Sequence, residues 1–416
     1  MPFILWKPFK YLLLWWRVEK FLKQQRAVLF EVKMPEEILK PIRAMESVMT
    51  SIQQAIYQPP GNWWERWVDG QIQLSVAFEM AAIDGEPHFF VRTHKPFRDA
   101  VESAIYSQYP EVEIKEVDDY TKYVPQSLPN KEWDMFGWDY RFLKDDHYPL
   151  KTYRKFETEH EPLEEKRVDP LAVLLEASAK IKKGEQLWIQ FLAEPLTAED
   201  TLGNPLGKWK KKGEEMRDRL VKRPEIPKQK AMIHEAADVL VLGKLPEEEK
   251  QEKEFLPPEM KLTPGEREVV GEIENKMAKP LFVSTIRFIY MGDREVWFKN
   301  NFRLGFDYFS SFNTLNMNSI QPNGRTLTKI KKSWFLPLNI VKDRRHYLRC
   351  RRLFKRYQAR FSPFFPKAGG TFVLNVEEMA TMFHFSGRAS APAPGVPRVV
   401  SKKGSLPANL PIELEE

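Results

Sequence analysis

Residues 72–80, IQLSVAFEM, decide the fold class of this 416-residue chain. Large apolar side chains stand at every second position and alternate with small or polar ones at Gln73, Ser75, Ala77 and Glu79. A period of two sends alternate side chains to opposite faces of a strand, so the stretch predicts a half-buried β-strand. The pair Asp84-Gly85 predicts a turn, and residues 87–92 predict the antiparallel partner of a hairpin.

The segments around this hairpin complete an α+β pattern. Residues 28–32 alternate as a strand, and residues 36–57 predict a helix. Six apolar residues mark one stripe of that helix: Ile38, Ile42, Met45, Met49, Ile52 and Ile56. Pro96 opens a second helix, and residues 111–117 return as a strand. The order β-α-β-β-α-β is that of a ferredoxin-like sandwich, in which two helices cover one face of an antiparallel sheet.

The rest of the chain predicts a second α+β unit. It contains strands at 187–192 and 281–290 and helices at 208–221 and 265–277. A further helix from about residue 293 places four aromatic residues on one stripe: Phe298, Phe302, Phe306 and Phe309. The connecting region before this unit predicts a strand at 137–144 and a helix that begins at Asp169-Pro170.

A chain of 416 residues exceeds what one core usually supports, so we expect two α+β domains. The predicted division is an amphipathic helix at 1–26, a ferredoxin-like domain at 27–124, a connecting region at 125–185, a second domain at 186–386 and a disordered Pro-rich tail at 387–416. The second domain includes a charged insert at 222–264, which we expect to be flexible because its composition buries little apolar surface.

The first 26 residues carry six basic side chains against one acidic one. Their apolar run at 11–16 is far shorter than the roughly 20 residues of a spanning helix. Tryptophans flanked by cations suit a helix that lies on an anionic membrane surface. A helix packed on its own domain or on a partner is the alternative. The cluster of Trp63, Trp64 and Trp67 has two interpretations as well: it contacts lipid or another protein, or it packs on its own domain. The predicted membrane contacts are Trp6, Lys10, Leu12, Leu13, Trp15, Trp16 and Arg17.

The strongest electrostatic feature is the stretch 325–360, which holds thirteen basic residues and one acidic residue, Asp343. From residue 341 the pattern is helical, with a narrow apolar seam that includes Cys350, Phe354 and Tyr357. Like charges one helical turn apart repel, so we expect a counter-charge from nucleic acid, anionic lipid or an acidic protein surface. The candidate contacts are Arg344, Arg345, Arg349, Arg351, Arg352, Lys355 and Arg356.

Catalytic signatures do not occur in this sequence. It contains neither a Gly-x-x-x-x-Gly-Lys-Ser/Thr loop nor a Gly-x-Ser-x-Gly elbow nor a His-Glu-x-x-His pair. We therefore predict no enzymatic activity, no cofactor and no metal site. Neighbouring arginines favour a lowered pKa for the single cysteine, Cys350, although we interpret it as a helix residue beside a basic face. The pairs Asp118-Asp119 and Glu377-Glu378 are predicted on solvated faces or at helix starts.

Several segments together resemble a bacterial domain family associated with type IV secretion systems. They are FEVKMP at 30–35, VESAIYSQYP at 101–110, YPLKTY at 148–153, GEQLWIQF at 184–191, IRFIY at 286–290 and TFVLNVEEMATMFHF at 371–385. The family precedes, or is encoded near, coupling-type ATPases of secretion and conjugation. The resemblance covers about residues 27–411, and none of the matching segments is catalytic.

This resemblance implies a non-catalytic scaffold that lies peripherally on the cytoplasmic face of the bacterial inner membrane. Its partner would be a P-loop coupling ATPase, which we expect to be a separate polypeptide because this sequence carries no phosphate-binding loop. The alternative hypothesis is a stand-alone nucleic-acid-binding protein that contacts DNA through the basic helix at 341–361. The cargo and the oligomeric state are left open.

Overall fold

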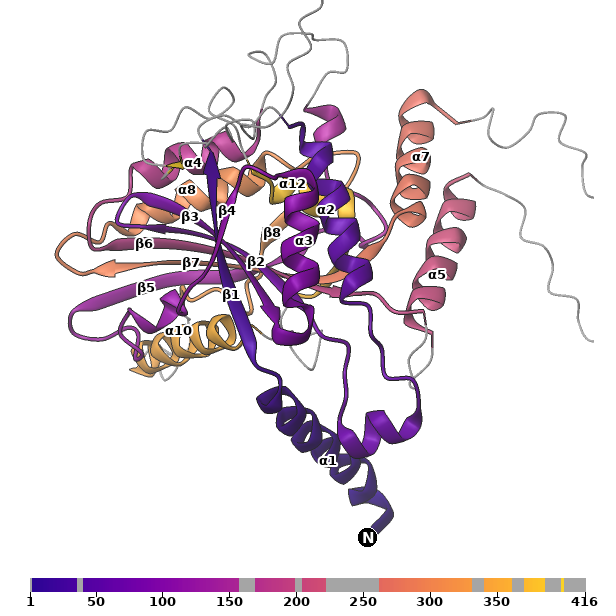
Figure 1. The fold of residues 1–416 in the computed structure, drawn as a ribbon, viewed down its shortest axis with the longest axis horizontal. Coiled ribbons are helices and arrows are strands. Elements are labelled where there is room, and N and C mark those ends of the chain that lie inside the picture. Colours follow the sequence, from indigo (N-terminus) through magenta and orange to yellow (C-terminus); the bar gives the residue numbers. More distant parts are fainter. Residues whose placement is uncertain are drawn as a thin grey trace, which may run out of the picture.

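The computed structural model describes residues 2–35, 40–156, 169–198, 204–221, 262–330, 340–360, 370–385 and 398–399. Within them the chain forms one large sheet with helices on both faces, which confirms a mixed α+β fold (Figure 1). Nine strands pair antiparallel, and β10 (Arg398–Val399) pairs parallel with β1 at the edge.

The first half of the sheet contains the predicted β-α-β-β-α-β order. Its elements are β1 (Ala27–Pro35), α2 (Ile42–Ala55), β2 (Val76–Ile83), β3 (Glu86–His94), the 3-10 turn η2 (Lys95–Phe97), α3 (Arg98–Gln108) and β4 (Glu113–Glu116). The strands lie in the spatial order β4-β1-β3-β2, and each neighbouring pair is antiparallel. The turn between β2 and β3 has positive φ at both Asp84 and Gly85, as a tight hairpin requires.

The second half repeats this strand order. Its elements are β5 (Trp133–Phe142), α4 (Leu171–Ala179), β6 (Glu185–Pro195), α5 (Pro205–Leu220), α7 (Pro264–Ala278), β7 (Leu281–Asp293), α8 (Phe302–Ser310) and β8 (Ile320–Pro322). The spatial order is β8-β5-β7-β6, and again each neighbouring pair is antiparallel. In both halves the first strand therefore lies between the third and the fourth.

The two halves join through their second strands. β2 pairs antiparallel with β6 from Val76 opposite Ala193 to Ile83 opposite Gln186. The sheet thus runs without interruption between the predicted domains, and Glu79 lies opposite Gln190 near the middle of the junction. That residues 27–124 and 186–386 fold as separate domains, joined by residues 125–185, stays a prediction.

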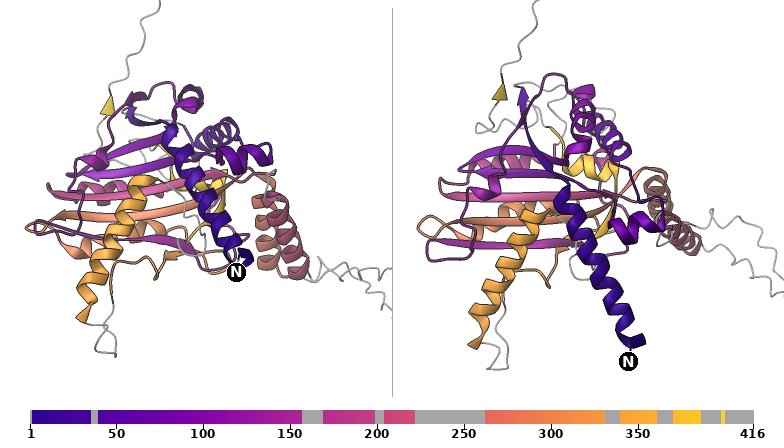
Figure 2. Two further views of the ribbon diagram at one scale, coloured as in Figure 1. Left: turned by 90° about the horizontal axis from the view of Figure 1, so that it is seen from below. Right: turned by 60° about the horizontal axis from the view of Figure 1, so that its bottom comes forward.

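Helices cover the two faces unequally. One face carries α2, α3, α4, α8 and α12 (Val376–Met382), and its core includes Phe78, Phe191 and Phe288. On the other face lies α10 (Lys342–Ala359), whose apolar seam packs on Trp188 and Ile289 (Figure 2). The remaining elements are α1 (Pro2–Gln24), β9 (Phe372–Asn375), the π-helical turn η1 (Glu65–Asp69) and the 3-10 turns η3 (Tyr120–Lys122), η4 (Tyr153–Lys155) and η7 (Lys299–Asn301).

Two helix boundaries differ from the prediction. The helix expected from about residue 293 begins at Phe302, because a turn with a 2.7 Å hydrogen bond from Trp297 N to Asp293 O comes first. Phe298 is consequently not on its stripe. The helix expected at 36–57 begins at Ile42, after Pro41. Residues 222–261 of the charged insert, and the Pro-rich tail apart from β10, lie outside the described residues.

Candidate surface-binding site

Helix α1 projects from the start of β1 and carries the predicted membrane contacts (Figure 1). Its large side chains face solvent: Trp6, Leu12, Trp15 and Trp16 are each half or more exposed, and Leu13 is 38% exposed. Lys10 is exposed, whereas Arg17 is half-buried and lies over the Trp16 ring at 5.1 Å. These residues therefore form one aromatic and cationic surface, which we call the α1 surface.

The opposite side of α1 packs on its own chain. Leu14 and Val18 are buried there. Lys10 is exposed but also contacts this part of the chain, because its Nζ lies 4.1 Å from the centroid of the Trp67 ring. The close approach needs glycine at position 70, because a Cβ there would lie 2.4 Å from the backbone carbon of Arg17. One side of the helix thus docks on residues 65–70, and the other side is exposed; its contact with a membrane stays a prediction.

The tryptophans of the adjoining loop divide in the same way. Trp63 and Trp64 are 59% and 62% exposed, while Trp67 lies beneath Lys10. The α1 surface and the Trp63-Trp64 pair therefore expose aromatic side chains from two packed elements. Among the described residues, no helix is both long and apolar enough to cross a membrane.

Helix α10 presents the predicted basic face, and only part of it is neutralised within the chain. Arg349 donates to the Leu327 carbonyl at 2.8 Å, and Arg356 pairs with Asp139 at 3.1 Å. The other five candidates make no side-chain hydrogen bond or ion pair in the described structure: Arg344, Arg345, Arg351, Arg352 and Lys355. Among the described residues, an acidic side chain of the same chain thus pairs with one of the seven, Arg356, and a backbone carbonyl accepts from a second, Arg349.

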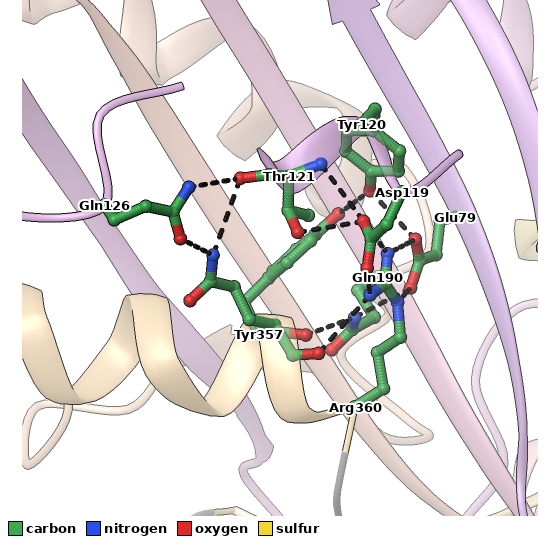
Figure 3. Close-up of polar contacts among 9 residues, drawn as sticks. Glu79, Asp119, Tyr120, Thr121, Gln126, Gln190, Tyr357 and Arg360 are labelled. Atoms are coloured by element: carbon green, nitrogen blue, oxygen red, sulfur yellow. Dashed lines mark hydrogen bonds and ion pairs between the residues drawn. The ribbon is translucent and has the colours of Figure 1, made fainter. Parts of the chain in front are cut away.

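A buried polar network fixes the C-terminal end of α10 to the sheet (Figure 3). Arg360 ends the helix with a positive φ of 48°, and its guanidinium reaches Glu79 at 2.7 and 3.0 Å. It also donates to Asp119 at 3.0 Å. Although burial opposes the charged form, the ion pairs with Glu79 and Asp119 raise the pKa of Arg360 well above its usual value. The same guanidinium holds the pKa of Asp119 below its usual value, against the effect of burial.

Further hydrogen bonds tie this network to both halves of the sheet. Tyr120 donates to Glu79 at 2.9 Å and meets the Tyr357 hydroxyl at 2.7 Å. Gln190 donates to Glu79 at 2.8 Å and accepts from Arg287 at 2.8 Å. Burial raises the pKa of both tyrosines well above the usual value and lowers that of Arg287 to about 10. The network therefore lies where β2 meets β6, directly under α10.

The sequence did not reveal this network. The structure bears out the helix-start alternative for the predicted acidic pairs and shows burial where a solvated face was the other choice. The alternation at 72–80 indicated a solvated polar face, but Glu79 is fully buried because α10 covers it. Asp119 caps η3, as the helix-start alternative predicted, and it also pairs with Arg360. Glu377 and Glu378 are also buried; Glu378 closes the capping box of α12 and pairs with Lys276 at 3.0 Å.

Cys350 is a further correction. The neighbouring arginines were expected to lower its pKa, but burial raises the pKa of the thiol to about 12. Its side chain points to the sheet and lies 3.7 Å from the Met135 carbonyl, whereas Arg351 and Arg352 are exposed. The thiol is therefore protonated at neutral pH and packs as a core residue, in keeping with its interpretation as a helix residue.

The Asp145-Asp146-His147 cluster brings three possible metal ligands within 4.8 Å of one another. Both ring nitrogens of His147 already have partners, since Nδ1 meets Asp145 and Nε2 meets the Trp209 carbonyl at 2.8 Å. Lys212 pairs with Asp145 as well. This geometry joins the loop after β5 to helix α5 and leaves no histidine nitrogen of this cluster for a metal ion.

No protein-family model matches the chain, and a search of curated proteins found no match to it.

Proposed function

We propose that this protein is a non-catalytic, membrane-proximal scaffold that binds an anionic membrane surface through the α1 surface and the Trp63-Trp64 pair. The observation that carries the proposal is the exposure of Trp6, Leu12, Trp15 and Trp16 on a helix whose other side is docked. Removing a large apolar side chain from water stabilises binding by about 1.5–3 kcal/mol, so several such residues suffice for a peripheral attachment.

The basic face of α10 supports the same orientation. Figure 2 shows α1 and α10 on one side of the sheet, both extending past its edge. Cations near an anionic leaflet each contribute about 1 kcal/mol within a Debye length of the surface. The five unpaired basic residues of α10 therefore add long-range attraction to the apolar contact made by α1. We place the protein peripherally on the cytoplasmic face of the bacterial inner membrane.

Sedimentation of the full chain with lipid vesicles tests this proposal. We expect the protein to pellet with vesicles that contain phosphatidylglycerol and to stay in the supernatant with phosphatidylcholine vesicles. Added salt should weaken the binding without abolishing it, because the tryptophan contact is not screened. If the protein does not pellet with phosphatidylglycerol vesicles at low salt, the proposal is contradicted.

The protein partner that we propose is a separate P-loop coupling ATPase, on the basis of the family resemblance over residues 27–411. The strand orders β4-β1-β3-β2 and β8-β5-β7-β6 support a scaffold of two ferredoxin-like units. Affinity capture of the tagged chain from gently solubilised native membranes should retain an ATPase in stoichiometric amount. Deleting residues 387–416 should release it, and capture without any ATPase would refute this partner.

A second candidate function is non-specific nucleic-acid binding by α10, which the five unpaired basic side chains favour. Phosphate contacts of this kind release counterions, so DNA affinity should fall by orders of magnitude between about 50 and 200 mM salt. Replacing Arg344, Arg345, Arg351 and Arg352 with Ala should abolish it. The matched control replaces Lys208, Lys210, Lys211 and Arg219, four exposed basic residues of α5. Equal DNA binding by both variants in a fluorescence anisotropy titration would exclude α10 as the site.

A further inference from the structure

A cavity of about 1140 Å³ lies between α1, the loop at 59–75 and the strand ends of the sheet junction. The end of β3, the end of β6, the start of β7 and the C-terminal end of α10 close its inner side. Pockets for small molecules usually measure about 300–1000 Å³, so this one has room for a ligand with a long chain. It adjoins the elements that carry the exposed tryptophans.

Apolar side chains line the wall that α1 contributes. Leu14 and Val18 are buried there, within one helical turn of the exposed Trp15 and Trp16. Leu74 and Leu196 face the same cavity from the loop and from the end of β6, and both are buried. A solvated ion alone would gain nothing from such a wall, whereas an acyl chain would bury its methylenes against it.

The polar lining is mostly cationic and incompletely paired. Five basic side chains line the cavity against the two acidic residues Glu19 and Glu194. Two of the basic residues already have ion-pair partners, since Lys23 pairs with Glu19 at 2.8 Å and Arg360 pairs with Glu79. The Arg92 side chain makes no hydrogen bond or ion pair in the described structure. Burial lowers its pKa to about 10, although the negative charges of Glu79 and Asp119 act in the opposite direction.

Two further buried atoms of the lining have no hydrogen-bond partner among the described residues. Arg66 Nε is buried without an acceptor, and it belongs to the η1 turn that docks α1. His94 is 5% exposed, and its Nδ1 has no hydrogen-bond partner among the described residues. A buried polar group without a partner costs free energy, and an uncompensated cation costs more. An anionic group that meets the guanidinium groups of Arg92 and Arg66, which line the same cavity, would remove these costs.

We propose that this cavity binds one anionic phospholipid, with its phosphate at Arg92 and Arg66 and its acyl chain along the wall formed by Leu14 and Val18. The inference deepens the proposed function, because the membrane that α1 contacts supplies the lipid. The cavity would then bind a single anionic lipid molecule, while the α1 surface attaches the protein to the membrane. Arginine suits this role because its guanidinium meets a phosphate with two parallel hydrogen bonds.

Isothermal titration of the full chain with dihexanoyl-phosphatidylglycerol, kept monomeric in solution, tests the cavity without any membrane. We expect saturable binding with one lipid per chain and weaker binding of dihexanoyl-phosphatidylcholine. Arg92→Gln should weaken it by about tenfold or more, the contribution of one charge-assisted contact, and Arg66→Gln should weaken it independently. Arg98→Gln removes an equal charge from α3 outside the cavity and should leave the affinity unchanged.

Arg92→Gln should not lower the melting temperature of the lipid-free protein, because it removes a desolvated cation that has no ion pair. Arg92→Gln should also keep most of its sedimentation with phosphatidylglycerol vesicles. A loss of lipid binding in the cavity can therefore be distinguished from a loss of membrane binding by the α1 surface. The proposal is overturned by an absence of saturable lipid binding, by equal affinity of Arg92→Gln and Arg98→Gln, or by binding of dodecanoate or inorganic phosphate in preference to the phospholipid.

Discussion

Replacing Glu79 with Gln should lower the free energy of unfolding by about 3–5 kcal/mol, the usual cost of removing one partner of a buried ion pair. Glu79 is fully buried, and Arg360 is 2% exposed. The carboxylate accepts hydrogen bonds from Arg360, Tyr120 and Gln190 at once. A neutral amide cannot balance the guanidinium, and its NH₂ group would face donors that need acceptors.

Urea unfolding followed by tryptophan fluorescence measures this loss, because the Trp188 ring lies 5.3 Å from the ring of Tyr357 beside the network. Glu176→Gln is the matched control, since it breaks an exposed pair with Lys180 on α4 and should leave the midpoint unchanged. The double variant Glu79→Gln with Arg360→Met should recover part of the loss, because it removes a buried cation that only Asp119 would still balance. A loss below about 1 kcal/mol in the single variant would show that the network is not structural.

The second large effect is expected at the α1 surface. Leu12→Asp combined with Trp16→Asp should weaken binding to phosphatidylglycerol vesicles by at least about 100-fold. Each substitution removes an apolar side chain from the lipid contact and adds a charge that the anionic headgroups repel. Both residues are more than half exposed, so the fold should not change.

Leu315→Asp serves as the control for this variant, because Leu315 is 96% exposed in the loop between α8 and β8. It carries the same chemical change at a position away from α1 and should bind vesicles like the unaltered chain. Partition coefficients from sedimentation over a lipid titration give the comparison. If the Leu12 and Trp16 double variant binds as tightly as Leu315→Asp, then the exposed side of α1 does not contact lipid.

Local periodicity predicted most of the secondary structure. The alternation at 72–80 marks β2, the run at 187–192 falls within β6, and the helix expected at 265–277 is α7, Pro264–Ala278. These signals depend on residues that are close in sequence, and burial on one side imposes their period. The prediction placed the start of α8 too early, because the aromatic spacing includes Phe298, which lies before the 3-10 turn η7 and outside the helix.

Long-range contacts explain what the sequence could not predict. Arg360 and Glu79 are 281 residues apart, and nothing in either segment identifies the other as its partner. The polar face of β2 is typical of a solvated strand until α10 is placed upon it. The cavity beside Arg92 needs α1, η1 and the strand ends in their final arrangement, so its unpaired groups have no signature in the sequence. The exposed half of α1, by contrast, was predictable from its clustered tryptophans and cations.

Quenching of tryptophan fluorescence by phospholipids brominated on their acyl chains tests the central claim most directly. With the full chain on phosphatidylglycerol vesicles, we expect the exposed tryptophans of α1 to be quenched and their emission to shift to the blue. The core residues Trp138 and Trp188, which are buried, should keep their emission. Vesicle binding without any quenching would mean that charge alone holds the protein at the surface, and it would contradict the insertion of the α1 surface into the membrane.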